Sequence, residues 1–322
     1  MKSTAPRNRP WDVRDLPRAE GKNVLVTGGN AGIGYFVAEQ LAGAGAVVTL
    51  GSRDPAKAEA AAGSIRARVP GAEVRHVRLD LADLSSLEHT VGSLGPCRLD
   101  AVVHNAGVAL DDPPRRETED GHELMFGTNH LGHLALTRWL APLLAEAPAG
   151  RIVTVGSFAA KSERLDLDDL QSREDYVPKR AYARSKLAQM YVGLELARRL
   201  GALGSPVSSV VVHPGGALDS LTPARPPVHR RTSGERLRGL PAALVLQGKH
   251  AGAWPAVRAV LDPRVRTGEL WGPRAFGLRG RPHREAVWSQ LTDTAVASQL
   301  WSASCELLDI DPDFLRDRRA CS

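Results

Sequence analysis

The chain has 322 residues and a formal net charge of +6, with 43% hydrophobic and 24% charged residues. This balance is typical of a soluble globular protein with one large α/β domain or two small ones. No apolar run approaches the ~20 residues that cross a bilayer, and the basic first ten residues lack the apolar core of a secretory signal. Three scattered cysteines predict no disulfide framework and favour a reducing, cytoplasmic environment.

The basic residues are mostly arginine and are spread along the chain, apart from a cluster at 225–238. This spacing does not predict a nucleic-acid partner. The abundance of Ala, Gly, Pro and Arg is typical of a GC-rich genome, so we expect a bacterial source.

Strand and helix patterns alternate along the chain. In chain order, the expected strands are 23–27, 46–50, 74–79, 99–104, 151–156, 207–212 and 268–271. The expected helices are 33–44, one opened by Asp54 and Pro55, 83–94, 121–144, 182–200, 246–261 and 284–308. This order predicts an α/β fold, a single Rossmann-type doubly wound parallel sheet with helices on both faces.

The same pattern predicts one domain. We expect an N-terminal extension over 1–20, a dinucleotide-binding and catalytic domain over 21–310, and a C-terminal tail over 311–322. The Pro- and Arg-rich stretch at 216–240 follows the sixth strand, so it is the expected substrate lid.

A glycine-rich loop, Thr27-Gly-Gly-Asn-Ala-Gly-Ile-Gly34, joins the first strand to the first helix. Glycines let the chain turn tightly and let its backbone approach a pyrophosphate, while the helix N-terminus offers free N–H groups. The loop therefore predicts a dinucleotide site. Its candidate contacts are Gly28, Asn30, Gly32, Ile33 and Gly34.

The end of the second strand bears on the choice of nicotinamide cofactor. An NAD site usually has an acidic residue there, which binds the ribose hydroxyls. Here Ser52 and Arg53 occupy this place, and the nearest carboxylate, Asp54, is expected to cap the next helix. A guanidinium can bind a 2′-phosphate, a contact worth roughly 1.5–3 kcal/mol. We predict NADP(H), the alternative being that Arg53 is an ordinary surface residue.

Two other strand ends are candidate cofactor contacts. Asp80 follows the third strand and is placed to meet an adenine edge, unless it or Asp83 caps a helix. Asn105, Ala106 and Gly107 follow the fourth strand, where small residues leave room for the nicotinamide ribose.

Tyr182 and Lys186 are the candidate proton-transfer pair, because positions four apart share one face of a helix. A free phenol has a pKa of ~10, too high for a base at neutral pH. A lysine ammonium ~4 Å away contributes about 4 kcal/mol at an effective dielectric constant of ~20, the required scale. Lys186 is also placed to bind the cofactor ribose.

Two polar residues complete the candidate site. Ser157 ends the fifth strand, at the carboxyl edge of the sheet where ligands bind, and there it can polarise a carbonyl oxygen. Asn129 lies in a long helix, where it can hold a water or the lysine. Taken singly, Ser157 could be a turn residue and Asn129 an ordinary polar helix residue.

Together these motifs resemble the short-chain dehydrogenase/reductase family over residues 20–310. The matching pieces are 27–34, Asp80-Leu81, 105–107, Asn129, Gly156-Ser157, 182–186 and Pro214-Gly215. The resemblance implies a catalytic tetrad of Asn129, Ser157, Tyr182 and Lys186. It also adds Leu81, Pro214 and Gly215 to the cofactor contacts.

The segments 128–133 and 185–188, and the C-terminal pieces 252–254, 268–273 and 300–301, are similar to the retinol-dehydrogenase-like branch. That likeness implies NADP(H) and apolar carbonyl or alcohol substrates. Members of this family often pair through the helices that hold Asn129 and Tyr182. The resemblance therefore implies that a homodimer or homotetramer can form.

One position departs from the family pattern. Where the family often has a threonine that contacts the nicotinamide carboxamide, this chain has Asp219, followed by Ser220 and Thr222. One of these two hydroxyls is expected to take over, or the local contact is loosened. The expected lid also carries five arginines, which indicate either an acidic substrate or only a solvated surface: Arg225, Arg230, Arg231, Arg236 and Arg238.

The resulting hypothesis is an NADP(H)-dependent carbonyl reductase or alcohol dehydrogenase, with Tyr182 as general acid/base. One alternative keeps the fold but performs imine reduction, epimerisation or dehydration in a biosynthetic pathway. Another is a non-catalytic, NADP(H)-binding regulator. His130 and His133 lie three residues apart without a third ligand at useful spacing, so no metal site is predicted.

Overall fold

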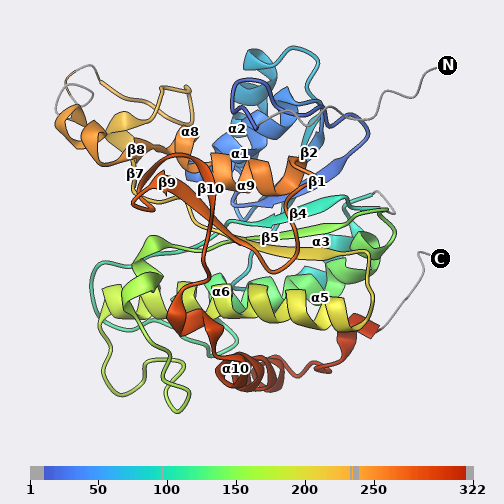
Figure 1. Cartoon of the computed structure of the whole chain (residues 1–322), viewed down its shortest axis with the longest axis vertical. Helices are drawn as coiled ribbons and strands as arrows, with labels where there is room; N and C mark the ends of the chain where they lie inside the picture. The colour runs from blue at the N-terminus through green and yellow to red at the C-terminus, as the bar shows by residue number, and fades with distance from the viewer. Residues whose placement is uncertain (1–10, 96–97, 233, 235–238, 317–322) are drawn as a thin grey trace.

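The computed structural model describes residues 11–95, 98–232, 234 and 239–316 (Figure 1). Its centre is a sheet in the strand order β10-β9-β6-β5-β4-β1-β2-β3. Neighbouring strands are parallel except for β9 and β10, an antiparallel pair at one edge. The strands are β1 (Asn23–Thr27), β2 (Val47–Ser52), β3 (Val74–Arg78), β4 (Ala101–His104), β5 (Arg151–Val155), β6 (Ser208–Val212), β9 (Leu270–Ala275) and β10 (Arg279–Glu285).

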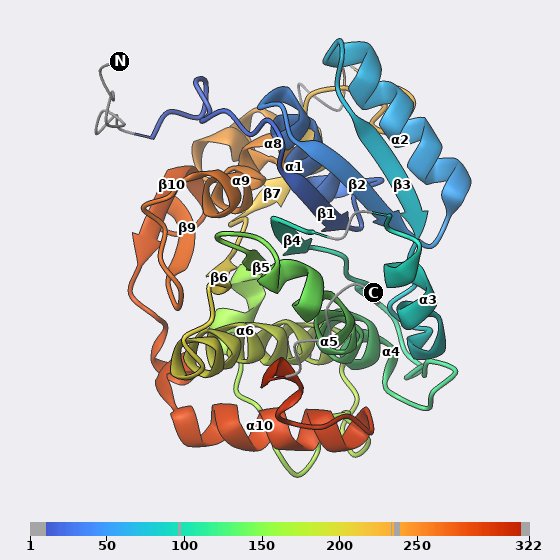
Figure 2. The ribbon, with the colours of Figure 1, turned by 90° about the vertical axis from the view of Figure 1, so that its right-hand side faces the viewer.

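Helices cover both faces of this sheet and bury one apolar layer on each. α1, α2 and α9 pack on one face, and α3, α5 and α6 pack on the other. α10 lies outside α6 as an additional layer (Figure 2). Their bounds are α1 (Gly32–Gly43), α2 (Pro55–Arg68), α3 (Leu87–Gly92), α5 (Gly132–Ala145), α6 (Pro178–Ala202), α9 (Trp254–Leu261) and α10 (Thr294–Leu307).

Local sequence explains these elements. β4 is buried along its whole length, as expected for a parallel strand covered on both faces. α2 begins where the sequence predicts, because Asp54 accepts a hydrogen bond from Lys57 N at 3.1 Å and Pro55 fits the first turn. The predicted Rossmann-type fold is confirmed, with one antiparallel edge strand added.

Four predicted helices differ from the structure. The helix expected over 83–94 is a 3₁₀ turn, η1 (Leu84–Ser86), followed by α3. The helix expected over 121–144 is α4 (Leu124–Phe126), a π-helical turn η2 (Gly127–Leu131) and α5 in succession. The helix expected over 246–261 is divided into α8 (Lys249–Gly252) and α9, with Pro255 in the first turn of α9. The helix expected over 284–308 is wrong at its start, because β10 extends to Glu285.

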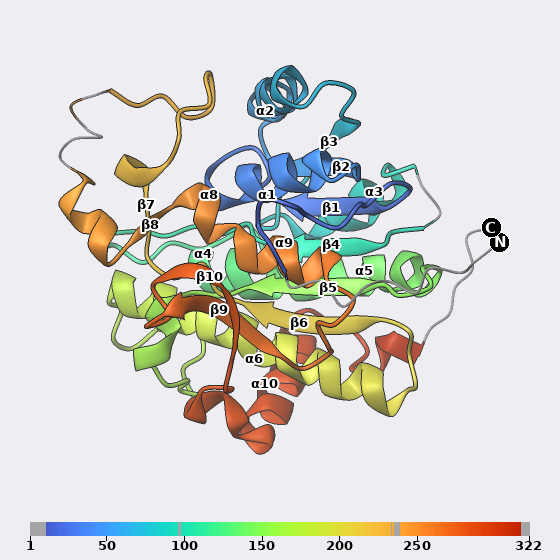
Figure 3. The ribbon, with the colours of Figure 1, turned by 45° about the horizontal axis from the view of Figure 1, so that its top comes forward.

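The excursion after β6 is longer than the predicted lid and packs beside α1 (Figure 3). It contains β7 (Ala217–Leu218), η4 (Asp219–Leu221), η5 (Pro241–Leu244), β8 (Gln247–Gly248) and α8. β7 and β8 pair in parallel as a separate small sheet. Arg236 and Arg238 lie outside the described residues.

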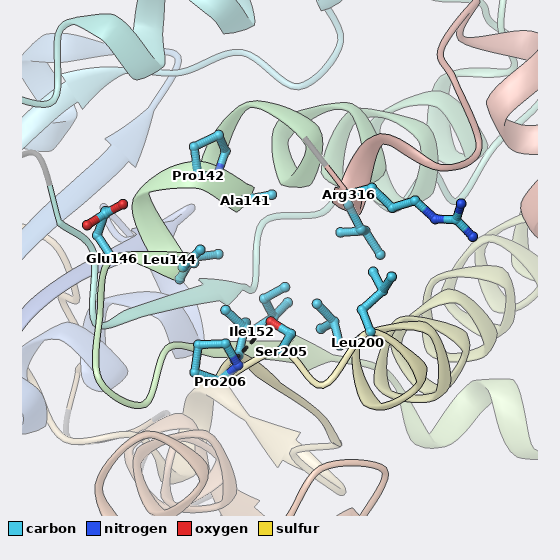
Figure 4. A pocket seen from close by; sticks show the side chains of 13 residues that line it. Ala141, Pro142, Leu144, Glu146, Ile152, Leu200, Ser205, Pro206 and Arg316 are labelled. Carbon is cyan, nitrogen blue, oxygen red and sulfur yellow. Dashed lines mark hydrogen bonds between the residues drawn. The ribbon is translucent and has the colours of Figure 1, made fainter. Parts of the chain in front are cut away.

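A cavity of about 350 Å³ lies at the amino edge of the sheet, between the ends of α5 and α6 (Figure 4). Leu144, Ile152, Leu200 and Arg316 are among the residues that line it. Since the predicted site lies at the opposite, carboxyl edge, this cavity is not part of it. Within the described part of the chain, no helix combines the length and hydropathy needed to cross a membrane.

Candidate active site

The glycine loop has the shape that a dinucleotide site needs. Gly28 and Gly32 have φ values of +65° and +58°, a region that favours glycine. A Cβ on Gly32 would point into open space, whereas one on Gly34 would lie 2.4 Å from Asn105 Nδ2. Gly32 therefore leaves room for a ligand, and Gly34 lets the loop pack closely. The first turn of α1 has no side-chain cap, so its N–H groups can bind an anion.

The loop after β4 is fixed to the end of β1. Thr27 Oγ1 accepts hydrogen bonds from the backbone N of Asn105 and of Ala106, each at 2.9 Å. Asn105 Nδ2 donates to Thr27 O at 3.0 Å. A Cβ on Gly107 would lie 3.2 Å from Asn129 Oδ1, so this position needs a small residue. The predicted segment 105–107 thus lies beside both the glycine loop and Asn129.

The end of β2 carries the residues from which a 2′-phosphate site was predicted. Arg53 is exposed and Ser52 is buried. Ser52 Oγ exchanges hydrogen bonds with the backbone of Asp54, and the Asp54 side chain caps α2. The capping and its Lys57 partner hold the pKa of Asp54 below its usual value, because they stabilise the carboxylate. This carboxylate therefore caps the helix, while the neighbouring Arg53 is exposed.

Asp80 forms a local turn, since its Oδ1 accepts from Ala82 N at 3.0 Å. The side chain therefore does not cap the helix that follows, and Asp83 makes no capping bond either. Leu81 is buried, and its carbonyl lies 2.2 Å from the place a Cβ on Gly132 would occupy. Leu81 thus packs against the start of α5.

Tyr182 and Lys186 lie four residues apart on α6, one helical turn, as predicted. Tyr182 is half-buried and Lys186 is buried. Lys186 Nζ donates to Val155 O at 2.6 Å and to Gln189 Oε1 at 2.5 Å. Burial lowers the pKa of Lys186 to about 7, so the amine changes charge near neutral pH.

Asn129 lies in the π-helical turn and is fully buried. Its side chain accepts from Val108 N at 2.7 Å and donates to Val108 O at 3.0 Å. The same amide donates to Ser185 Oγ at 2.9 Å, and Ser185 Oγ donates to Tyr182 O at 2.7 Å. The side chain of Asn129 is therefore tied to the helix that carries Tyr182. Of its two predicted partners, a water or Lys186, the lysine is not contacted directly.

Ser157 follows β5 and is half-buried. Its Oγ accepts from Ala159 N at 3.2 Å, which leaves the hydroxyl proton available to another acceptor. α6 packs against this strand end, since a Cβ on Gly156 would lie 2.4 Å from Met190 Sδ. The bond from Lys186 to Val155 O joins the same strand end to the lysine. The structure thus brings the four predicted tetrad residues to one edge of the sheet.

Pro214 and Gly215 follow β6 at the same edge. Pro214 O accepts from Gln247 Nε2 at 2.9 Å. Gly215 has a φ of +68°, and a Cβ there would lie 2.5 Å from Leu278 O. This segment is therefore held between β8 and the turn that joins β9 to β10.

The sequence analysis did not predict that three buried side chains, those of His104, His133 and Gln189, belong to the site. It considered His133 only as a metal ligand. His133 Nδ1 lies 2.9 Å from Asn129 O, and its Nε2 lies 2.9 Å from Thr27 Oγ1. A carbonyl can only accept, so Nδ1 carries the proton and Nε2 accepts from Thr27. Burial holds the pKa of His133 well below its usual value and lowers that of His104 to about 3. Both rings are neutral at physiological pH.

In the lid region, Asp219 and Thr222 both have partners within the chain. Asp219 Oδ1 pairs with Lys249 Nζ at 2.6 Å. Thr222 Oγ1 donates to Leu218 O and accepts from Lys249 N, so both of its hydrogen-bonding roles serve the lid itself. The idea that Thr222 replaces the missing threonine is therefore not favoured, which leaves Ser220 or a loosened contact as the alternatives. His130 and His133, which lie three residues apart, have different partners. His130 Nε2 bonds Ser304 Oγ at 2.7 Å, whereas His133 Nε2 bonds Thr27 Oγ1.

The lid arginines also have internal partners. Arg225 makes a bidentate ion pair with Glu39 of α1, with N···O distances of 2.6 and 3.0 Å. Arg231 donates to Ser220 O. Arg230 is exposed. Of the two interpretations of these arginines, recognition of an acidic substrate is not favoured for Arg225, because its charge is paired with Glu39.

Comparison with known proteins now decides the family. A family profile described as short chain dehydrogenase matches residues 22–222. The chain is a short-chain dehydrogenase. This matched region includes the glycine loop, Asn129, Ser157, Tyr182 and Lys186.

Relatives of this short-chain dehydrogenase cover nearly its whole length. It is 36% identical over 299 residues to polyprenol dehydrogenase of Mus musculus, with 91% of this chain and 85% of the relative aligned. It is 34% identical over 302 residues to retinol dehydrogenase 13 of Homo sapiens, covering 92% and 88%. A solved Mycobacterium paratuberculosis structure has a TM-score of 0.75 and 34% identity, covering 94% and 98%. The dehydrogenase therefore belongs to the retinol-dehydrogenase-like branch and is an oxidoreductase.

Proposed function

We propose that this enzyme is an NADP(H)-dependent oxidoreductase that interconverts a carbonyl and an alcohol. The observation that carries the proposal is the placement of Tyr182 and Lys186 on one turn of α6 at the carboxyl edge of the sheet, where the glycine loop also lies. Nicotinamide, when bound, supplies or accepts the hydride. The remaining chemistry belongs to the chain's own side chains.

Each of the four tetrad residues has a role that its surroundings support. Ser157 has a hydroxyl proton free to donate to a carbonyl oxygen, which polarises that bond. Tyr182 is half-buried at the same edge and moves the proton to or from this oxygen. A positive charge on Lys186 stabilises the phenolate of Tyr182. Asn129 holds the helix of Tyr182 through Ser185.

The cofactor assignment rests on the glycine loop and on Arg53. The uncapped start of α1 and the open space at Gly32 fit a pyrophosphate. The exposed guanidinium of Arg53, with Asp54 engaged in capping, favours a 2′-phosphate over free ribose hydroxyls. Asp80, Leu81, 105–107, Pro214 and Gly215 complete the proposed cofactor contacts.

An apolar substrate is supported by four exposed apolar side chains on the lid and on the β9–β10 turn, which follow β6 and β9. Leu240, Leu244, Val245 and Phe276 are 52%, 81%, 54% and 91% exposed. The lid and the β9–β10 turn that carry them are joined by a hydrogen bond from Arg279 to Ala243 O. Exposed apolar groups of this size around a site favour an apolar ligand. The names of two relatives, polyprenol and retinol dehydrogenase, denote apolar alcohols.

The experiment is an NADPH oxidation assay with a panel of apolar aldehydes and ketones, paired with NADP⁺ reduction by the matching alcohols. We expect turnover with NADPH and much weaker turnover with NADH. Titration of NADPH fluorescence measures binding separately. Tight NADPH binding without turnover on the whole panel would favour the non-catalytic regulator, and absence of binding would refute the proposal.

A further inference from the structure

The buried amide of Gln189 has no role in the mechanism described above, yet it contacts the amine of Lys186. Both residues lie on α6, three positions apart, and they are 3% and 4% exposed. Lys186 Nζ donates to Gln189 Oε1 at 2.5 Å. An ammonium can only donate, so the amide oxygen must face the lysine and the amide nitrogen must face away.

The nitrogen of this amide faces the end of β4 and the first turn of α5. Gln189 Nε2 lies 3.4 Å from His104 O at the end of β4, and 3.1 Å from His133 Nδ1 on α5. Because His133 Nδ1 already donates to Asn129 O, the Gln189 amide donates to the carbonyl of His104. Gln189 therefore links Lys186 on α6 to β4, and it is held from both ends.

The groups that face Lys186 are uncharged acceptors or neutral rings. Its acceptors are Val155 O of β5 and Gln189 Oε1. The titratable groups around it are Tyr182 on the same helix, His104 on β4 and His133 on α5. Burial is the cause of the lowered pKa of Lys186, and no carboxylate among the described residues opposes it.

We propose that Gln189 is a positioning residue that holds the Lys186 amine through a neutral acceptor. This arrangement fixes the position of the amine without locking its proton into an ion pair. A glutamate of the same shape would pair with the ammonium and keep it charged. Gln189 thereby sets both where Lys186 lies and how readily it exchanges its proton. The part of this inference that concerns catalysis by Lys186 rests on the proposed function.

The first test needs no turnover. Unfolding temperature is measured between pH 7 and pH 9.5 for the wild type, Gln189→Glu, Lys186→Met and the matched control Gln171→Glu, another buried glutamine. A folded-state pKa of about 7 against an ordinary lysine value means that the unfolded state binds more protons in this range. The wild type should therefore gain stability as pH rises.

The expected result is that Gln189→Glu and Lys186→Met both lose this gain, while Gln171→Glu keeps it. An equal pH dependence in Gln189→Glu and the wild type would overturn the proposal, as would an equal loss in Gln171→Glu. This outcome does not depend on any substrate, so it is distinct from failure of the proposed function.

The second test uses the reductase assay. Gln189→Glu should move the Lys186-dependent limb of the kcat profile to higher pH by at least about one unit, the scale of a charge pair. Gln189→Met, which keeps the volume but removes the acceptor, should lower kcat at least tenfold, and Gln189→Asn should recover part of it. If Gln189→Met does not fold, the kcat values and pH profiles of Gln189→Glu and Gln189→Asn test the proposal. Unchanged kcat and pH profile in these variants would contradict the proposal.

Discussion

The side-chain amide of Asn129 donates a hydrogen bond to Ser185 Oγ at 2.9 Å. Ser185 lies between Tyr182 and Lys186 in the sequence, and its hydroxyl donates in turn to Tyr182 O. The π-helical turn of Asn129 is thus joined to the turn of α6 that carries the proposed proton donor. Asn129 and Ser185 support the site by holding that helical turn in position.

Replacement of Tyr182 by phenylalanine tests the proton-transfer role directly. We expect kcat to fall by about 10²–10⁴-fold, the usual contribution of general acid/base catalysis, because the phenol proton is lost. NADPH affinity should stay nearly unchanged, since the ring remains. Steady-state kinetics and NADPH fluorescence measure the two quantities. Tyr176→Phe, at another half-buried tyrosine, is the control, and wild-type-like turnover by Tyr182→Phe would refute the assignment.

Replacement of Arg53 by alanine tests the cofactor preference. Loss of a charge-assisted contact worth roughly 1.5–3 kcal/mol should weaken NADPH binding by about 10- to 150-fold and leave NADH binding almost unaltered. Arg75, an exposed arginine on β3, provides the control variant Arg75→Ala. Equal losses for both cofactors, or none for NADPH, would show that Arg53 is only a surface residue.

Acid stability should depend on His104. Its folded-state pKa of about 3 lies below the ordinary value of 6.5, because the ring is buried. The unfolded state therefore binds a proton that the folded state does not, so stability is lost as pH falls from about 6.5 toward 3, by up to ~1.4 kcal/mol per pH unit.

His104→Leu removes this pH-dependent loss of stability. It also removes a buried Nε2 atom that has no hydrogen-bond partner. The midpoint of acid unfolding, followed by circular dichroism, should move to lower pH. His89→Leu, at an exposed histidine, should leave it in place. An unmoved midpoint in His104→Leu would mean that other groups govern acid unfolding.

The ion pair between Arg225 and Glu39 should hold the lid against α1. The two side chains are only 14% and 10% exposed, so removal of one charge leaves the other poorly solvated. Arg225→Met should cost about 1.5–3 kcal/mol of unfolding free energy, the scale of hydrogen bonds to charged groups.

Chemical denaturation measures this loss, and Arg230→Met, at an exposed lid arginine, is the control. If Arg225 instead recognised an acidic substrate, its replacement would raise KM for acidic compounds alone and leave stability intact.

The fold was predictable because its signals are local. The valine-rich segments that become β4 to β6, the glycine loop and the Asp54-Pro55 pair each indicate one structure. β10 was missed because Arg279–Glu285 contains no alternation of apolar residues. This segment forms a strand because its backbone pairs with β9.

The placement of the four proposed tetrad residues at one edge of the sheet was predictable because they have fixed spacing to recognisable strands and helices. Gln189 was not, since a glutamine in an amphipathic helix gives no sign that it will be buried against a lysine. Asp219 likewise gave no sign of its partner, because Lys249 lies on α8, which returns to the lid only in the folded chain.

The placement of α10 limits how copies of this enzyme can assemble. Leu300 and Trp301 are fully buried against the outer surface of α6, and Arg199 of α6 lies 4.5 Å over the Trp301 ring. A second molecule that approached by this surface would have to displace α10 first. We therefore expect light scattering to give the mass of a single 34.5 kDa chain, or of an assembly built through other surfaces. Trp301→Ala should loosen α10 and promote self-association.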